Sequence, residues 1–232
     1  MLDCNPVNTP IEIGIKLSRF DEGHTEDPTL FKSLVGSLRY LACTRSDILF
    51  AIGVISRFMQ APTSTHIKAA KRIVRYLKGT IDYGLLYSTS IDFKLVGFSD
   101  SDFVRDIDDR KSTTSFVFFM GDCAVTWSSK KQSIITLSTC EAEYVATTSC
   151  VCHAIWLRRL LEELYLKQGE ATKICIDNKS TLALAKNPVR HDRSKHIDTR
   201  YHFIRECIDK KEVKLKYMKT HDQVIDIFIK SL

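Results

Sequence analysis

The sequence predicts an α/β domain whose mixed five-stranded sheet is flanked by helices, preceded by a small helical unit. Apolar residues recur at helical spacing over residues 27–79, and the pattern changes to short β-branched and aromatic runs from about residue 84. From residue 91 the expected element order is βββ-α-β-α-α-β-α. Three consecutive strands followed by β-α crossovers produce a mixed sheet with helices on its faces.

The first part of the chain reads as a loose lead-in followed by three helices. Residues 1–26 lack periodicity, and Asp27 and Pro28 then supply an N-cap and a first helical residue. The basic residues of the third helix fit an exposed polar face better than a nucleic-acid contact; they are Lys68, Lys71, Arg72, Arg75 and Lys78. The expected organisation is a lead-in (1–26), a helical connection-like unit (27–90) and the α/β domain (91–232).

The second part alternates between strand and helix patterns. Gly121 and Asp122 separate two β-rich runs and predict a hairpin turn. Predicted strands cover residues 84–88, 94–102, 112–121, 123–131, 172–177 and 213–219. Predicted helices cover residues 139–165, 178–186, a segment capped by Ser194, and 222–230.

Composition and charge narrow the function classes. The chain has 232 residues, a hydrophobic fraction of 44% and a net charge of +6, typical of a globular protein. It shows neither a signal peptide nor an apolar run of membrane-spanning length, so an intracellular protein is expected. The eight cysteines lack zinc-type spacing and are expected to be reduced thiols.

The charge is unevenly distributed along the chain. Residues 91–177 carry a net charge of −3, whereas residues 178–219 carry +7. Acidic residues beside a cationic block suit metal-assisted chemistry on a polyanion, although a solvated basic face explains the second block equally well.

Acidic residues coincide with strand ends and with one helix start. Asp100 and Asp177 each end a predicted strand, where sites form in α/β sheets. Glu141 has capping-box spacing from Ser138, so Glu143, which lies too far into the helix to cap, is the better functional candidate. Carboxylates brought together repel one another, and divalent cations would hold them in place.

The role of several other acidic residues is not decided by the sequence pattern. Asp102 could share the strand face of Asp100, while Asp106, Asp108 and Asp109 read as turn residues. Asp222 and Asp226 lie four apart on one helix face, where a metal role and simple solvation are equally compatible with the pattern.

Long stretches of the chain resemble the Pol polyprotein of copia-type retrotransposons. The segment that begins SLVGSLRYL and ends RYLKGT resembles the connection between reverse transcriptase and ribonuclease H. The segment from FSDSDF to CEAEYVA resembles the first half of the ribonuclease H domain. The strings RSKHIDTRYHFIRE and THDQVIDIFIKSL resemble its second half.

The resemblance implies a ribonuclease H that cuts the RNA strand of RNA–DNA hybrids. It makes Asp100, Glu143, Asp177 and Asp226 the catalytic and metal-binding acids, with two Mg²⁺ ions roughly 4 Å apart, or Mn²⁺ in their place. The hybrid backbone would be contacted by Ser138, Thr139, Asn178, Lys195 and Arg200. His196 or His221 would assist product release, although a lone histidine is more often structural. The reverse transcriptase portion of Pol is an expected partner.

Some positions depart from the family pattern. Small residues are usual where Val104 and Arg105 stand, Gly is usual at Ser115, and Ile225 replaces a smaller residue. Arg105 could crowd the site or pair with Asp100. No YVDD-like string occurs, so polymerase activity is not expected. The alternative function is a catalytically silent remnant that binds nucleic acid; an integrase is disfavoured by the order of the acids.

Overall fold

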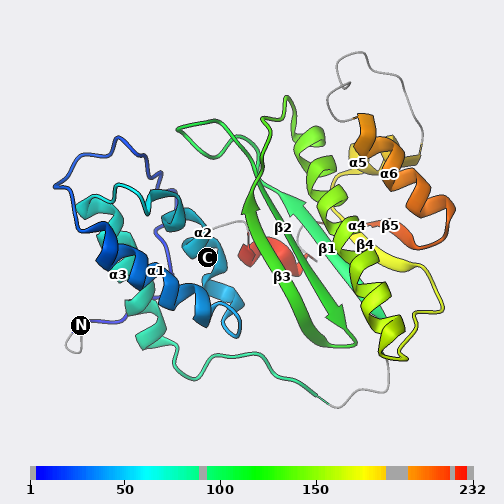
Figure 1. The fold of residues 1–232 in the computed structure, drawn as a ribbon, viewed down its shortest axis with the longest axis horizontal. Helices are drawn as coiled ribbons and strands as arrows, with labels where there is room; N and C mark the ends of the chain where they lie inside the picture. The colour runs from blue at the N-terminus through cyan, green and yellow to red at the C-terminus, as the bar shows by residue number, and fades with distance from the viewer. Residues whose placement is uncertain (1–3, 89–92, 187–197, 220–222, 229–232) are drawn as a thin grey trace. The chain divides into compact units, whose positions relative to one another are not determined.

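The chain forms two compact units in the computed structural model, which describes residues 4–88, 93–186, 198–219 and 223–228 (Figure 1). The first unit is built from the chain up to Leu85, with Arg105–Arg110 and the residues from Ile227 onward. The second is built from Leu86–Val104 and Lys111–Asp226. The loop Arg105–Arg110, which the sequence boundaries assign to the α/β domain, thus belongs to the first unit.

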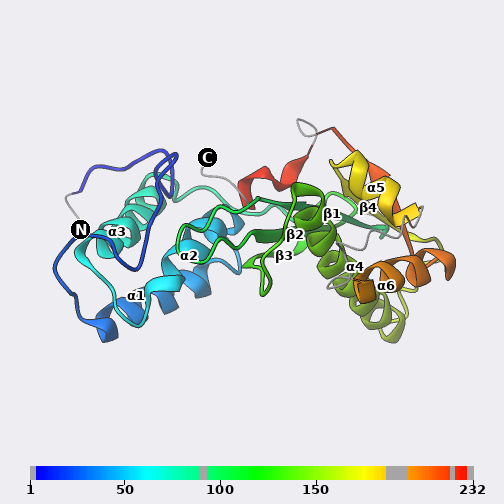
Figure 2. The same cartoon turned by 90° about the horizontal axis from the view of Figure 1, so that it is seen from above.

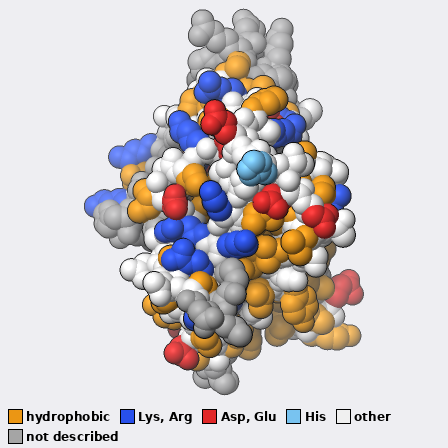
Figure 3. Space-filling model, turned by 90° about the vertical axis from the view of Figure 1, so that its left-hand side faces the viewer, with side chains coloured by type: hydrophobic (Ala, Val, Ile, Leu, Met, Phe, Trp, Pro, Cys, Tyr) orange, Lys and Arg blue, Asp and Glu red, His pale blue; other side chains and the backbone are white. Residues whose placement is uncertain are grey.

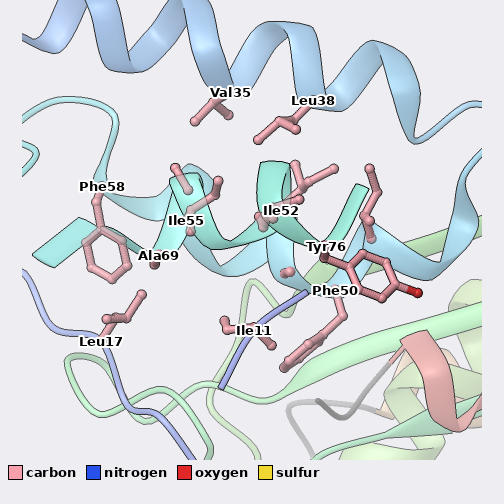
Figure 4. Close-up of a cluster of buried hydrophobic side chains, with 14 of the residues drawn as sticks. Ile11, Leu17, Val35, Leu38, Phe50, Ile52, Ile55, Phe58, Ala69 and Tyr76 are labelled. Carbon is pink, nitrogen blue, oxygen red and sulfur yellow. The ribbon is translucent and has the colours of Figure 1, made fainter. Parts of the chain in front are cut away.

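The first unit is helical. Its elements are α1 (Pro28–Leu41), η1 (Ser46–Ile48), α2 (Leu49–Ile55), η2 (Ser56–Phe58) and α3 (Ser64–Gly79). Asp27 is the N-cap of α1 and its Oδ1 accepts from Thr29 N at 2.8 Å, which confirms the predicted helix start. The buried faces of the three α-helices meet in one apolar core (Figure 4).

The lead-in is irregular but is packed onto this core. Ile11 and Leu17 are only 2% and 8% exposed and lie on the side of the core away from Val35 of α1 (Figure 4). Arg75 Nε donates to Asn5 O at 2.7 Å and, likewise from α3, Lys78 Nζ donates to Cys4 O at 2.9 Å. Part of the basic face of α3 therefore anchors the lead-in. On the face shown in Figure 3, Lys and Arg side chains are interspersed with acidic and apolar ones.

A buried ion pair joins the turn before η1 to the end of α3. Arg45 Nη2 and Nε donate to the two carboxylate oxygens of Asp47 at 2.7 and 3.0 Å. The same guanidinium donates to Thr80 O at 2.9 Å and Thr80 Oγ1 at 2.6 Å, and Tyr76 OH donates to Asp47 Oδ2 at 2.8 Å. Burial would raise the pKa of Asp47, but the hydrogen bonds from Arg45 and Tyr76 outweigh burial and lower it.

His66 is fully buried in the first turn of α3. Its Nδ1 accepts from Thr63 N at 3.0 Å, which leaves Nε2–H to donate to Ser18 O at 3.0 Å, and its ring stacks on Phe58 with centroids 3.9 Å apart. Burial lowers the pKa of His66, and the Ser18 carbonyl opposes this only in part. The folded protein therefore favours the neutral form of the His66 imidazole.

The first unit should therefore lose stability in mild acid. Because the pKa of His66 is lower in the folded than in the unfolded chain, the unfolded chain takes up the proton first as the pH falls below the ordinary value of 6.5. We expect the free energy of unfolding to fall through that window, and less steeply in His66→Gln. Urea titrations followed by circular dichroism between pH 7.5 and 5 measure this. His24→Gln, at an exposed histidine of the same unit, is the control; equal slopes in all three proteins would contradict the expectation.

The second unit contains one five-stranded sheet. Its strands are β1 (Leu95–Ser101), β2 (Thr113–Met120), β3 (Cys123–Lys131), β4 (Thr172–Ile176) and β5 (Val213–Tyr217), in the order β3-β2-β1-β4-β5. β1, β2 and β3 are antiparallel, whereas β1, β4 and β5 are parallel. Gly121, with φ of +59°, forms the predicted turn between β2 and β3. The predicted mixed five-stranded sheet is confirmed.

Helices pack against this sheet. They are α4 (Thr139–Glu163), α5 (Lys179–Lys186), α6 (Asp198–Asp209) and the short 3₁₀ helix η5 (Val224–Phe228). α4 lies across β1 and β2, and α6 packs beside it (Figures 1 and 2). The first half of α4 is buried almost all round, and α4 contacts α5 and α6 as well as the sheet. In the second half of α4, Leu157 and Leu161 are buried, whereas Trp156 and Leu164 are 55% and 58% exposed.

Other sequence expectations differ from the structure. Residues 84–88 form no strand; Leu86 is 87% exposed, and Ser88 contacts the Cys123 side chain at the start of β3 without pairing as a strand with it. Ser194 lies outside the described residues. All eight cysteines are free thiols, of which four are buried. In the part of the chain that the structure describes, no helix has the length and apolarity needed to cross a bilayer.

Candidate metal centre

Three acidic side chains converge at one end of the sheet. Asp100 is the penultimate residue of β1, Asp177 directly follows β4, and Glu143 lies near the start of α4. Since β1 and β4 are parallel neighbours, both aspartates lie at the carboxyl ends of their strands. Each residue offers a carboxylate oxygen, and these oxygens all lie within 4.8 Å of one another. Three of the acidic residues that the sequence analysis selects as candidates therefore lie together in the folded protein.

The backbone at the end of β1 connects two of these acids. Ser101 N–H donates to Asp100 Oδ1 at 2.6 Å and to Glu143 Oε1 at 3.0 Å. Asp100 and Glu143 are 7% and 6% exposed, and Asp177 is half-buried. The second oxygen of Glu143, Oε2, is buried and has no hydrogen-bond partner among the described residues. A buried carboxylate oxygen of this kind favours a cation ligand.

The environment of Glu143 disfavours its charged form. Burial, the hydrogen bond to Asp100 and the charges of Asp100 and Asp177 all raise the pKa of Glu143 well above its usual value, and the Ser101 N–H only partly opposes them. The three carboxylates thus carry more negative charge than the protein alone stabilises. A divalent cation among them would relieve that repulsion.

The other predicted acids are placed differently. Asp102 Oδ1 accepts from Thr113 N at 2.5 Å, so Asp102 joins the ends of β1 and β2. Asp226 lies in η5, but its side chain is outside what the structure describes, as is all of Asp222. Glu141 Oε2 accepts from Leu137 N at 2.7 Å, so it binds the residue before the N-cap Ser138 and not the Ser138 N–H of the predicted capping box.

Some of the residues predicted to contact nucleic acid lie at the helix start and the strand end that carry the acids. Ser138 is the exposed N-cap of α4, with its Oγ accepting from Glu141 N at 3.2 Å, and Thr139 is the exposed first residue of that helix. Asn178 follows Asp177, and its Oδ1 accepts from two backbone N–H groups at the start of α5, at 2.9 and 3.1 Å. Arg200 is a half-buried residue of α6. Lys195, His196 and His221 lie outside the described residues.

Three positions that depart from the family pattern have different surroundings. Ser115 lies directly opposite Asp100 in the β1–β2 register and is fully buried, with its Oγ donating to Ser129 Oγ at 3.1 Å. Arg105 extends its guanidinium over the ring of Phe50, 5.1 Å from the centroid. Ile225 of η5 is fully buried.

Val104 has a strained backbone conformation. Its φ is +53°, in the left-handed region that a β-branched side chain rarely adopts. We expect Val104→Gly to raise the free energy of unfolding of the second unit by about 1 kcal/mol. The substitution removes the left-handed strain, and the greater conformational entropy of glycine in the unfolded chain offsets part of that gain. Urea denaturation followed by tryptophan fluorescence measures the change. Val125→Gly, at an exposed position of β3, should instead destabilise; a loss of stability in both variants would contradict the strain argument.

Sequence reasoning missed two polar residues beside the acids. Ser101 bridges two carboxylates through its backbone, and Gln132, which follows β3, donates to groups on both β1 and α4. No regular spacing in the sequence relates Gln132 to β1 or to α4, so these contacts could not be predicted.

The comparisons with known proteins agree with this fold. No protein-family model matches the chain. It is 41% identical over 237 residues to the retrovirus-related Pol polyprotein from transposon TNT 1-94 of Nicotiana tabacum, with 99% of the chain and 18% of that protein aligned. It is 38% identical over 232 residues to the Pol polyprotein from transposon RE1 of Arabidopsis thaliana, with 100% of the chain and 16% of that protein aligned.

A solved structure with a similar fold covers most of the chain. It is a foamy viral protease-reverse transcriptase in complex with dsDNA, with a TM-score of 0.54 and 15% sequence identity over 87% of this chain and 40% of that one. This likeness concerns the fold alone. The chain spans less than a fifth of the length of each of these two Pol polyproteins. On sequence identity along its whole length, the chain belongs to the Pol polyprotein family of copia-type retrotransposons and contains a ribonuclease H-like domain.

Proposed function

We propose that this chain is a metal-dependent ribonuclease that hydrolyses the RNA strand of RNA–DNA hybrids. The observation that supports it most is the convergence of Asp100, Glu143 and Asp177 within 4.8 Å, from three separate elements of the sheet domain. Carboxylate oxygens are the ligands that Mg²⁺ prefers, and the buried Glu143 Oε2 has no competing hydrogen-bond partner among the described residues. The donor set therefore fits a hard divalent cation.

The acidic residues would bind the metal ions, and the backbone at Ser101 orients two of these acids. Asp100, Glu143 and Asp177, with Asp226 as a fourth ligand, would hold two Mg²⁺ ions, for which Mn²⁺ is a substitute. When bound, such ions lower the pKa of coordinated water and stabilise charge on the oxygens of an in-line phosphoryl displacement. The protein orients its carboxylates through the Ser101 N–H, which keeps Asp100 and Glu143 together.

Substrate contacts extend from the acids along the domain. Ser138 and Thr139, exposed at the start of α4, and Asn178 after β4 are positioned to meet a phosphate backbone near the metal ligands. Lys195 and Arg200 belong to a stretch with a net charge of +7 that would attract a polyanion. The 2′-hydroxyl would distinguish RNA from DNA. The partners we propose are a hybrid and the reverse transcriptase portion of Pol, inside the cell, in cytoplasm or nucleus.

A labelled-hybrid assay tests this proposal. The purified chain is incubated with Mg²⁺ and an RNA–DNA hybrid labelled on either strand, in parallel with Asp100→Asn, single-stranded RNA and duplex DNA. We expect RNA cleavage in the hybrid only, and only by the unmodified chain. Hybrid binding without cleavage would favour the alternative of a catalytically silent remnant, and equal cleavage by Asp100→Asn would indicate a contaminating nuclease.

A further inference from the structure

Gln132 is a buried residue that contacts three elements at once. It directly follows β3 and is 5% exposed. Its Nε2 lies 3.0 Å from Ala142 O in α4, 3.0 Å from Thr114 Oγ1 in β2 and 3.3 Å from Ser101 Oγ in β1. A carbonyl oxygen only accepts hydrogen bonds, so the contact with Ala142 fixes which end of the amide faces this cluster.

Two of these three contacts lie next to the acids of the metal centre. Ser101 follows Asp100, and Ala142 precedes Glu143. Ser101 Oγ donates to Asp102 O at 2.7 Å, which leaves its lone pairs to accept from Gln132. Ser101 N–H in turn donates to both Asp100 and Glu143. Gln132 therefore joins the two backbone segments that carry two of the acids.

The carboxylates of these segments repel one another, so their spacing has to be held by something other than their own interaction. The elements β1 and α4 are separated by about forty residues of chain, and Gln132 bonds to both. We propose that Gln132 is a positioning residue that sets the distance between Asp100 and Glu143 for metal binding. This inference rests on the proposed metal-dependent function.

A buried hydrogen-bonding glutamine also stabilises a fold wherever it occurs, so the experiment needs a matched control. Gln168 serves, because it holds the opposite end of β1: its Oε1 accepts from Leu95 N at 2.9 Å and its Nε2 donates to Phe93 O at 2.9 Å. Methionine has a similar length and no amide, so Gln132→Met and Gln168→Met remove comparable contacts at the two ends of one strand.

The measurement is Mn²⁺ affinity by titration calorimetry on the full chain, with thermal unfolding of each variant recorded alongside. We expect Gln132→Met to weaken Mn²⁺ binding about tenfold, the lower limit for residues that orient metal ligands indirectly. Gln168→Met should bind Mn²⁺ like the unmodified chain even where it unfolds at lower temperature. Hybrid cleavage by Gln132→Met should recover at high Mn²⁺ concentration, because the ligands themselves are intact.

Equal Mn²⁺ affinity in Gln132→Met and the unmodified chain would overturn the positioning role while leaving the metal site in place. Equal weakening in both glutamine variants would also overturn it and assign the effect to general stability. Absence of Mn²⁺ binding to the unmodified chain would instead overturn the proposed function, and the inference with it. If Gln132→Met does not fold, Ser101→Ala removes the contact of Gln132 with β1, together with the Ser101 Oγ–Asp102 O hydrogen bond, and should weaken Mn²⁺ binding in the same direction.

Discussion

Glu143→Gln is expected to make the metal-free protein more stable while removing its capacity for divalent metal. The folded chain holds Glu143 against two other carboxylates, and burial with that repulsion raises its pKa. A carboxyl whose pKa is higher in the folded state weakens the fold progressively as the pH rises above its ordinary value of 4.5. A neutral amide has no such penalty, and we expect it to add roughly 1–2 kcal/mol at pH 7, as other substitutions at strained active sites do.

The same variant should lose catalysis. Changes in residues that only support metal ligands cost about 10–100-fold in affinity or activity, so loss of a ligand should exceed 100-fold in hybrid cleavage. Urea denaturation in EDTA, followed by tryptophan fluorescence, and Mn²⁺ calorimetry measure the two effects. Glu141→Gln, at the glutamate that binds Leu137 N before the same helix, is the control and should leave metal binding intact. A Glu143→Gln protein that is less stable than the unmodified chain in EDTA would contradict the repulsion argument.

Asp47→Ala should be the most destabilising single change in the helical unit. It leaves the guanidinium of Arg45, which is 8% exposed, without its carboxylate partner. Breaking a buried pair by removing one partner costs about 3–5 kcal/mol, because the remaining charge loses its counter-charge, although Arg45 would keep its hydrogen bonds to Thr80. At about 4–8 °C for each kcal/mol in a unit of about 60–100 residues, the melting temperature of the unit should fall by at least about 12 °C.

An ion pair of the same unit supplies the comparison. Arg72 Nη1 lies 3.2 Å from Glu12 Oε1, but the Glu12 side chain is 60% exposed. Glu12→Ala should therefore cost less than about 1 kcal/mol. Urea denaturation gives the free energies, and hydrogen exchange of peptides from α1 and α3 assigns the loss to this unit. Similar costs for the two substitutions would show that burial does not decide the contribution of the Arg45–Asp47 pair.

Local signals in the sequence predicted much of the fold. The Asp27–Pro28 helix start and the Gly121 turn depend on the conformational preferences of single residues, so they can be read without knowing the tertiary structure. The run at residues 84–88 has the composition of a strand and forms none. Whether such a run becomes a strand depends on a neighbour, and composition does not supply one.

The candidate site, too, was predicted only in part from the sequence. Asp100 and Asp177 were found because strand ends are recognisable, and Glu143 because its neighbour Glu141 already had capping-box spacing. Gln132 was missed because it bonds to Ser101, far earlier in the chain, and the Arg45–Asp47 pair because its further partners, Thr80 and Tyr76, lie in and after a different helix. A buried polar network has no periodicity, and only the folded structure shows which groups it connects.

The order of the strands has one more consequence. β3 and β5 each have a hydrogen-bonded neighbour on one side only, so the outer backbone groups of the sheet could pair with a strand of another molecule. β5 carries exposed Lys214 and Lys216 at alternate positions. An incoming strand would have to bring its own side chains beside these two like charges, and would desolvate both ammonium groups. The lysines that contribute to the basic character of this segment thus also protect one edge of the sheet from aggregation.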